Sequence, residues 1–129
     1  NGWMTLPMGL YLKKMYAKDP HFANTRVVYN IFNQEFNNDW DARLGEKLKF
    51  DGFDADVTDK FTSTDFLSVT AGMLNYVDGV NVGSENLSAG LQNIYDDLAC
   101  MKSPFVPEEY QTKTLAEFFD KIIEAELCL

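Results

Sequence analysis

The chain has 129 residues and a mass of 14.7 kDa, which corresponds to one small domain or to part of a larger one. Hydrophobic residues make up 46% and charged residues 24%, a composition typical of a folded protein rather than a disordered one. The net charge of −9 makes nucleic acid and anionic membrane poor partners, and no apolar run approaches the ~20 residues of a transmembrane helix.

The first half of the chain is predicted to contain two helices and one strand. A helix starts near Leu6, where apolar side chains begin to recur at three- and four-residue spacing, and it ends at Asp19-Pro20. Residues 26–33 are rich in β-branched and aromatic types, which is typical of a strand buried on both faces of a parallel sheet. A short helix is expected over 40–48.

The next three elements continue the alternation of helix and strand. A helix is predicted from Ser63 or Thr64 to Val77, because its apolar residues lie on one stripe. Residues 80–83 are expected to form a short strand, and Ser84 is expected to cap the helix that follows it.

The last two predicted elements complete the order. Phe105-Val106 are expected to form a third short strand, and Thr114 and Glu117 have the spacing of a capping box at the start of the last helix. Strands that alternate with helices predict an α/β fold, with a short, mostly parallel sheet and helices packed against it. Three strands are few for a complete domain of this kind, so we expect a partial domain.

Polar side chains gather where the predicted strands end. Asn30 and Asn33 lie toward the carboxyl end of the first strand, which is the edge at which open α/β sheets bind ligands. Gly83-Ser84 follow the second strand and open a helix, and a helix N-terminus in that position can bind an anion such as phosphate. A plain N-cap role for Ser84 is the simpler interpretation.

Aromatic residues offer a second kind of candidate site. Trp3, Phe36 and Trp40 have flat faces that match the apolar face of a pyranose. Aromatic side chains pack in a core or loop more often than they bind sugar, so both interpretations stay open.

The sequence offers little for metal or redox chemistry. His21 is the only histidine and is expected in a turn, and Cys100 and Cys128 lack a metal-ligand spacing, so we expect no metal site and no cofactor. The acidic segment 54–59 departs from a calcium-binding loop at the sixth position, and we expect a solvated loop there. Two lone cysteines are typical of a reduced, cytoplasmic protein, although one disulfide stays open.

Three stretches, read in order, carry a family resemblance. Residues 2–5, followed by 10–14, are similar to a His-Asp/Gly-Trp segment and a helix that ends in Tyr/Leu-Leu-Lys. Residues 28–33 are similar to a strand that ends in Ile/Val-His-Asn, and 48–52 follow it like Leu-x-Phe-x-Gly. Residues 76–84 are similar to Tyr-Ala-Asp-x-Ile/Val-Thr-x-Val-Ser. The set resembles the N-terminal catalytic domain of glycogen and starch synthases, which are ADP-glucose-dependent retaining glycosyltransferases with two Rossmann-like domains.

The resemblance covers about residues 1–95 and implies a Rossmann-like, three-layer α/β/α fold. It implies that the chain is a single partial domain over 1–129, the C-terminal half of that N-terminal domain. The implied activity is glucosyl transfer from a nucleotide sugar to an α-glucan in cytoplasmic glycogen biosynthesis, with both molecules as partners. Catalytic residues stay unassigned, and the expected substrate contacts are Asn1, Trp3, Asn30, Asn33 and Ser84.

Departures from the family pattern lead us to expect that the chain is inactive alone. Two family histidines correspond to Asn1 and Met4, a third corresponds to Phe32, and a lysine corresponds to Ala71. Charge-assisted donors stabilise a leaving diphosphate, and these substitutions remove such donors. Two alternatives stay open: a non-catalytic glucan- or protein-binding module that keeps the fold, or an unrelated α/β domain of flavodoxin-like or response-regulator-like type. An incomplete sheet also leaves an edge through which the chain could form a homo-oligomer.

Overall fold

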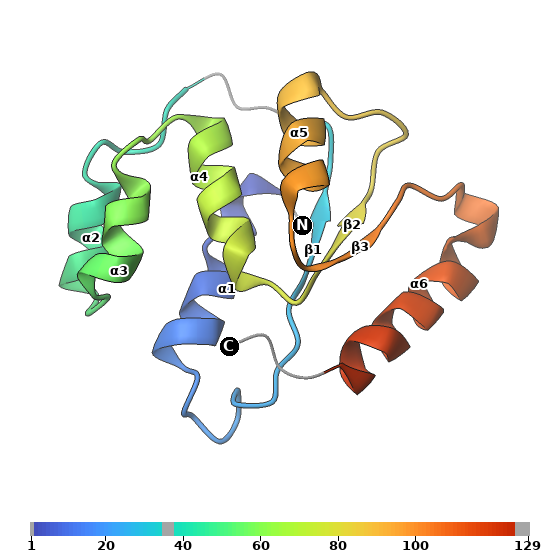
Figure 1. The fold of residues 1–129 in the computed structure, drawn as a ribbon, viewed down its shortest axis with the longest axis horizontal. Helices are drawn as coiled ribbons and strands as arrows, with labels where there is room; N and C mark the ends of the chain where they lie inside the picture. Colours follow the sequence, from blue (N-terminus) through green and yellow to red (C-terminus); the bar gives the residue numbers. More distant parts are fainter. Residues whose placement is uncertain (1, 35–37, 126–129) are drawn as a thin grey trace.

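The computed structural model describes residues 2–34 and 38–125, and within these ranges three parallel strands form one sheet (Figure 1). The strands are β1 (Val28–Ile31), β2 (Gly79–Val82) and β3 (Met101–Ser103), in the spatial order β1-β2-β3. Val28 lies opposite Gly79, and Gly79 lies opposite Met101, so the three strands start level with one another. The predicted α/β class with a short parallel sheet is confirmed.

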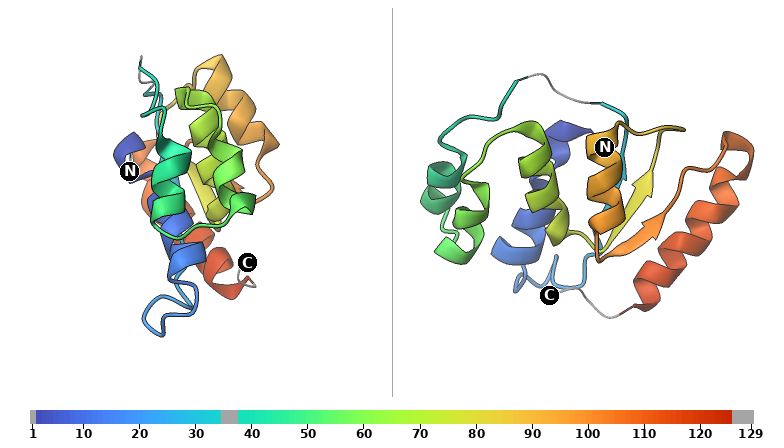
Figure 2. Two further views of the ribbon diagram at one scale, coloured as in Figure 1. Left: turned by 90° about the vertical axis from the view of Figure 1, so that its left-hand side faces the viewer. Right: turned by 45° about the horizontal axis from the view of Figure 1, so that its top comes forward.

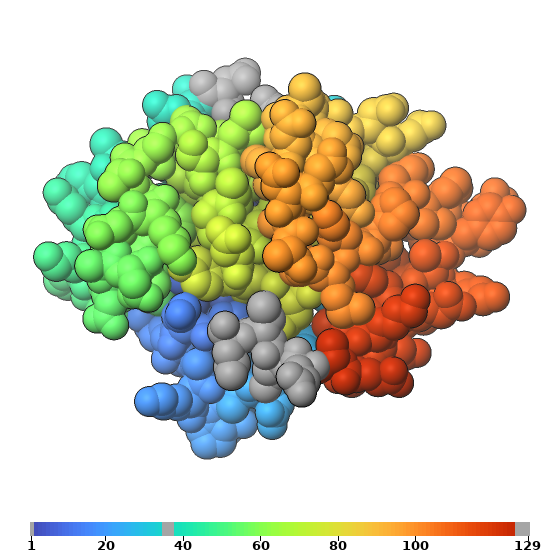
Figure 3. All heavy atoms as spheres, viewed as in Figure 1, coloured from blue at the N-terminus to red at the C-terminus, as the bar shows by residue number. Residues whose placement is uncertain are grey.

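Helices cover both faces of this sheet, as two further views show (Figure 2). The helical segments, in chain order, are η1 (Trp3–Thr5), α1 (Met8–Leu10), η2 (Tyr11–Met15), α2 (Leu44–Phe50), α3 (Ala55–Thr58), η3 (Asp59–Phe61), α4 (Phe66–Met73), η4 (Leu74–Tyr76), α5 (Ala89–Asp97) and α6 (Glu108–Glu124). α4 and α5 pack against each other over one face, and their side chains meet in the space-filling view (Figure 3). On the face opposite α4 and α5, α6 covers Gly79 of β2. A Cβ added to Gly79 would lie 3.0 Å from Phe118 Cζ. α2 and α3 lie at the end of the molecule far from α6 (Figure 1).

The helix predicted from Ser63 or Thr64 is α4, and Asp65 sets where it begins. The Asp65 carboxylate accepts hydrogen bonds from Ser63 Oγ at 2.6 Å and from Ser68 N at 2.9 Å. These hydrogen bonds lower the pKa of Asp65 to about 2, because they favour the charged carboxylate. Of the predicted stripe of this helix and the turn after it, Phe66 is only half-buried. The other members are buried: Val69, Thr70, Met73, Leu74 and Val77.

The first strand differs from the prediction in length and burial. β1 spans Val28–Ile31 rather than 26–33, and Val28, Tyr29 and Asn30 are only half-buried. The expectation of burial on both faces is therefore wrong for β1, whereas all residues of β2 are buried. The physical reason is position, because β1 lies at the edge of the described sheet and β2 lies at its centre.

The predicted cap of the helix after β2 is also wrong. α5 begins at Ala89, and its N-cap is Ser88, whose hydroxyl accepts a hydrogen bond from Leu91 N at 3.4 Å. Ser84 lies in the loop before this cap, and its Oγ instead accepts a hydrogen bond from Asn33 N at 2.9 Å. A contact to the other strand-end loop thus replaces the predicted local bond.

The last strand and helix both begin earlier than predicted. β3 is Met101–Ser103, and Phe105-Val106 are not in a strand. Proline lacks the amide hydrogen that a ladder needs, and prolines flank that pair on both sides. α6 starts at Glu108, and the acidic side chains of its first turn complement the helix dipole. Thr114 therefore lies inside the helix, and the capping-box prediction is wrong.

The remaining helical predictions are right in kind and shifted in place. The first predicted helix is α1 extended by the π-helical turn η2, and it ends at Met15, before Asp19-Pro20. The helix expected over 40–48 is α2. The expectation of a solvated loop over 54–59 is wrong, because residues 55–59 form α3 and the start of η3, with Asp54 as the N-cap of α3. His21 lies in a turn, as predicted, with its side chain 87% exposed.

Candidate functional site

The carboxyl ends of β1 and β2 bring two of the predicted site residues together. Asn33 follows β1 and Ser84 follows β2, and Asn33 N donates a hydrogen bond to Ser84 Oγ at 2.9 Å. The Asn33 side chain reaches further, since its Oδ1 accepts a hydrogen bond from Ser88 N at 2.8 Å. These two bonds tie the loop after β1 to the loop after β2.

Asn30 takes a different place from the one that strand-end reasoning suggested. It lies within β1, opposite Asn81 of β2, and its Oδ1 accepts a hydrogen bond from Asn81 Nδ2 at 3.2 Å. Asn81 is buried and Asn30 is half-buried. Asn30 therefore pairs across the sheet, while Asn33 and Ser84 form the contact at the strand ends.

The Trp3 ring packs against the side chain of Trp40 and is not an open face for sugar stacking. Its ring meets the ring of Trp40 edge-on, with centroids 5.9 Å apart. Beside Trp3 lies a cavity of about 10 Å³, which the side chains of Tyr29, Phe66 and Leu91 also line. That volume holds about one water molecule and not a sugar ring. Two further predictions, Asn1 as a substrate contact and Phe36 as a stacking residue, lie outside the described residues.

An aromatic ring covers the end of β2. Phe32 lies directly against Gly83, so that a Cβ at residue 83 would overlap the Phe32 ring. Gly83 is therefore required for close approach of the two strand ends rather than for an unusual backbone angle. The position at which the resemblance places a histidine thus holds an apolar side chain in van der Waals contact with the neighbouring loop.

Two backbone amides at the N-terminus of α5 already donate hydrogen bonds to side chains of the protein. Ser88 caps Leu91 N, and Asn33 accepts from Ser88 N. An anion at this helix end would have to compete with Ser88 Oγ for Leu91 N and with Asn33 Oδ1 for Ser88 N. The anion-binding interpretation of Gly83-Ser84 gains no support from this arrangement.

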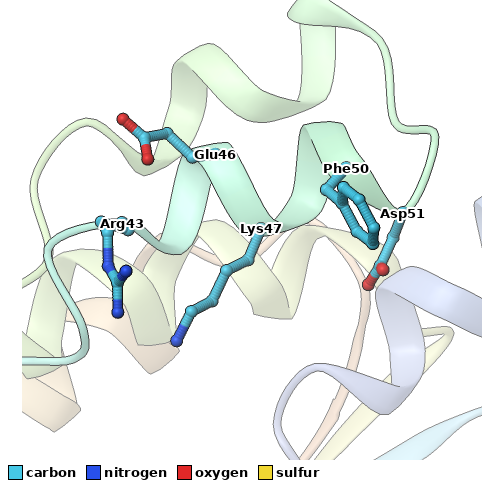
Figure 4. A pocket seen from close by; sticks show the side chains of 5 residues that line it. All are labelled: Arg43, Glu46, Lys47, Phe50 and Asp51. Atoms are coloured by element: carbon cyan, nitrogen blue, oxygen red, sulfur yellow. The ribbon is translucent and has the colours of Figure 1, made fainter.

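A larger hollow lies along α2, far from the strand ends. It has a volume of about 490 Å³ and is lined by Arg43, Glu46, Lys47, Phe50 and Asp51 (Figure 4). Sequence reasoning missed it, although one signal was present, since Phe50 lies off the buried stripe that Leu44 and Leu48 form. Phe50 is 92% exposed.

Within residues 2–34 and 38–125, no group of three or more His, Cys, Asp and Glu side chains is placed to hold a metal ion. Over the same part of the chain, none of the helices is both long and apolar enough to cross a membrane.

Comparison with known proteins gives two matches. The family model of the starch synthase catalytic domain matches residues 1–99. A glycogen synthase of Thermotoga maritima is 28% identical over 123 residues, which cover 95% of this chain and 21% of that protein. The chain therefore spans about a fifth of the length of this curated relative. No solved structure shows a significant match.

Proposed function

Because the chain belongs to the family of starch synthase catalytic domains, we propose that it forms the C-terminal half of the N-terminal domain in a glycogen- or starch-synthase-type glucosyltransferase. The protein that contains it would transfer glucose from ADP-glucose to an α-glucan in cytoplasmic glycogen biosynthesis. Support comes from the family match and from the glycogen synthase relative, which resembles nearly the whole chain.

Within such an enzyme, this chain is a scaffold and not the source of the groups that activate the donor. The observation that carries this conclusion is the contact of Phe32 with Gly83. It places an apolar ring at the strand ends, where a leaving diphosphate would need charge-assisted hydrogen bonds. Met4 and Ala71, at two other positions where the family pattern has a donor, add no charge. The chain alone is therefore proposed to be inactive.

The predicted substrate contacts take a positioning role in this proposal. Asn33 and Ser84 hold the two strand-end loops together, and Trp3 packs on Trp40 beside them. Asn30 joins the two strands through Asn81. These side chains would set the shape of the edge that faces the substrates, and Asn1 stays a predicted contact.

A non-catalytic glucan-binding module is the second candidate function. The apolar cover of the strand ends by Phe32 favours it as well, because binding of a neutral glucan needs no donor for a diphosphate. Self-association is a separate prediction. β1 has one strand neighbour within the described residues, so its other side offers an edge for pairing.

Assays of the full-length protein test these proposals directly. Transfer of labelled glucose from ADP-glucose to glycogen, with UDP-glucose as the comparison donor, is expected if the protein is an enzyme. Retardation in a glycogen-containing gel without transfer from either donor would favour the binding module. Absence of both activities would contradict both proposals. Sedimentation of the same sample at high concentration tests self-association, which a monomeric mass would exclude.

A further inference from the structure

The last helix, α6, is fixed to the domain along one side. Phe118 and Ile122 are buried where α6 covers Gly79 of β2. Arg26 Nε donates a hydrogen bond to Ile122 O at 3.0 Å, which holds the last turn of the helix. α6 is also the outermost helix at one end of the molecule (Figures 1 and 2). It follows residues 1–99, so the family match does not account for its outer side.

The outer side of α6 carries an apolar stripe of exposed residues at spacings of four, three and four: Thr112, Ala116, Phe119 and Ile123. Residues at these spacings share one helix face, and the same spacing forms the seam along which two helices pack in a coiled coil. Phe119 is 40% exposed and Ile123 is 65% exposed. The stripe is about 16 Å long, so it can receive a second helix along its length.

The sizes of these side chains favour a second copy of α6 in antiparallel orientation. The smaller residues, Thr112 and Ala116, occupy the first half of the stripe, and Phe119 and Ile123 occupy the second half. Antiparallel packing of two copies places Phe119 on Ala116 and Ile123 on Thr112, so a large side chain meets a small one in each layer. Parallel packing would oppose Phe119 to itself and Ala116 to itself, which overfills one layer and leaves space in the other.

Charged residues beside the stripe favour the same orientation. Lys113 and Asp120 both flank it on one side, and both are exposed. Antiparallel packing brings Lys113 of one copy near Asp120 of the other, and a two-fold axis makes this contact twice. Lys113 Nζ lies 4.0 Å from Glu117 Oε1 of its own helix, and its side chain is 87% exposed. Such an exposed pair contributes little, so the ammonium can also pair with a carboxylate of the second copy.

We propose that the outer stripe of α6 is an interface through which two copies of this protein associate about a two-fold axis. An interface of one helix from each copy lies at the small end of specific protein–protein contacts, so we expect a reversible dimer with a Kd of about 10 μM. The interface is separate from strand pairing at the edge of β1. It does not depend on glucosyl transfer.

Sedimentation velocity of the full-length protein, over about 1–200 μM and in about 0.15 M salt, tests the interface; this salt largely screens repulsion between chains of net charge −9. Ile123→Asp is expected to raise the dimer Kd by about tenfold or more, because it buries a carboxylate against an apolar surface. The matched control is Tyr110→Asp, which changes a 59% exposed aromatic residue of the same helix that lies off the stripe. This control is expected to leave the dimer Kd unchanged.

Charge reversal tests the antiparallel register. Lys113→Glu and Asp120→Lys each place like charges opposite each other in a dimer of identical copies, so each variant alone is expected to dimerise more weakly than the wild type. A mixture of the two variants restores both contacts between opposite charges, and it is expected to dimerise more tightly than either variant alone. Mixing cannot repair a loss of helix stability within one copy, so this result separates the interface from the fold.

Four outcomes would overturn the proposal. A monomer at every concentration would exclude the dimer, and a dimer that Ile123→Asp leaves intact would use another face, such as the edge of β1. A mixture of the charge variants that is no tighter than its components would exclude the antiparallel register. A monomeric wild type that loses thermal stability in Ile123→Asp, but not in Tyr110→Asp, would show that another part of the same protein covers the stripe.

Discussion

Lys13 and Asp78 form a buried ion pair, with Lys13 Nζ 2.5 Å from Asp78 Oδ2 and the two side chains 10% and 5% exposed. Lys13 lies in the π-helical turn η2, and Asp78 immediately precedes β2. Lys13 Nζ also donates to Thr25 O at 2.9 Å, and Asp78 Oδ2 accepts from Val27 N at 2.7 Å. One charge pair thus joins η2 to the chain just before β1 and β2.

Removing one member of this pair should destabilise the protein strongly. Asp78→Asn leaves the Lys13 ammonium buried without its counter-charge, and we expect a loss of about 3–5 kcal/mol in the free energy of unfolding. Lys13→Met with Asp78→Asn removes both charges and should cost less than the sum of the two single changes. Urea unfolding of the full-length protein measures the change, provided that the unfolding transition of this domain is followed and its free energy of unfolding is compared between the variants. Additive losses would contradict the coupling.

The contact of Phe32 with Gly83 makes a second prediction about stability. Gly83→Ala forces a Cβ into the Phe32 ring and should destabilise the domain by about 1–3 kcal/mol, as overpacking does. Phe32→Ala opens that space, so the double variant should lose less than the two single variants together. Thermal unfolding of all four proteins forms a double-mutant cycle. No coupling in that cycle would show that the ring does not rest on residue 83.

Asn33 should stabilise the start of α5 from outside the helix. Asn33→Ala removes the acceptor of the Ser88 amide and should cost about 1 kcal/mol, as the loss of a helix-end hydrogen bond does. Faster hydrogen exchange at Ser88 N is expected in the variant, and it can be followed by NMR. Asn93→Ala, at an exposed position of α5, is the matched control and should leave that exchange rate unchanged. Equal exchange in wild type and Asn33→Ala would refute this role.

Tyr29 should make the fold sensitive to strong alkali. Burial raises the pKa of Tyr29 to about 12, because the phenolate is poorly solvated in the fold. In the unfolded chain the same group ionises near pH 10, so its contribution to stability is complete below pH 10 and is lost as the pH rises toward 12. Tyr29→Phe should reduce the alkaline loss of stability. The change in unfolding free energy between pH 9 and 11.5 measures it, and an unchanged slope in Tyr29→Phe would count against the assignment.

Local patterns located most elements of the fold. The helical spacing of apolar residues in α4 and the β-branched run around Val28 are both visible within one short stretch of sequence, so each element can be predicted without knowing its neighbours. Helix ends were harder to predict, because Ser84 and Ser88 are both good caps and only the hydrogen bond from Asn33 N to Ser84 separates their roles. The prediction misplaced β3 because this strand is defined by its pairing with Gly79–Asn81. That pairing is a long-range contact, and the three residues Met101–Ser103 are too few to show a strand pattern of their own.

The candidate site divides in the same way. Sequence reasoning placed Asn33 and Ser84 at one edge, since carboxyl ends of parallel strands meet there. It did not show that Asn33 N bonds Ser84 Oγ, that Phe32 covers Gly83, or that the space beside Trp3 is only about 10 Å³. The first two depend on the distance between two loops that are about fifty residues apart in the chain, and the third depends on how side chains of η1, β1, α4 and α5 meet.

The sequence by itself determined the family and the α/β alternation, because motifs and periodicity are properties of neighbouring residues. Only the tertiary structure decided which strand is central, what the strand-end side chains bond, and that Phe50 is open to water. Burial and hydrogen-bond partners depend on which distant segments meet. A phenylalanine on the inner face of α2 would belong to the core, whereas Phe50, on the outer face, is 92% exposed.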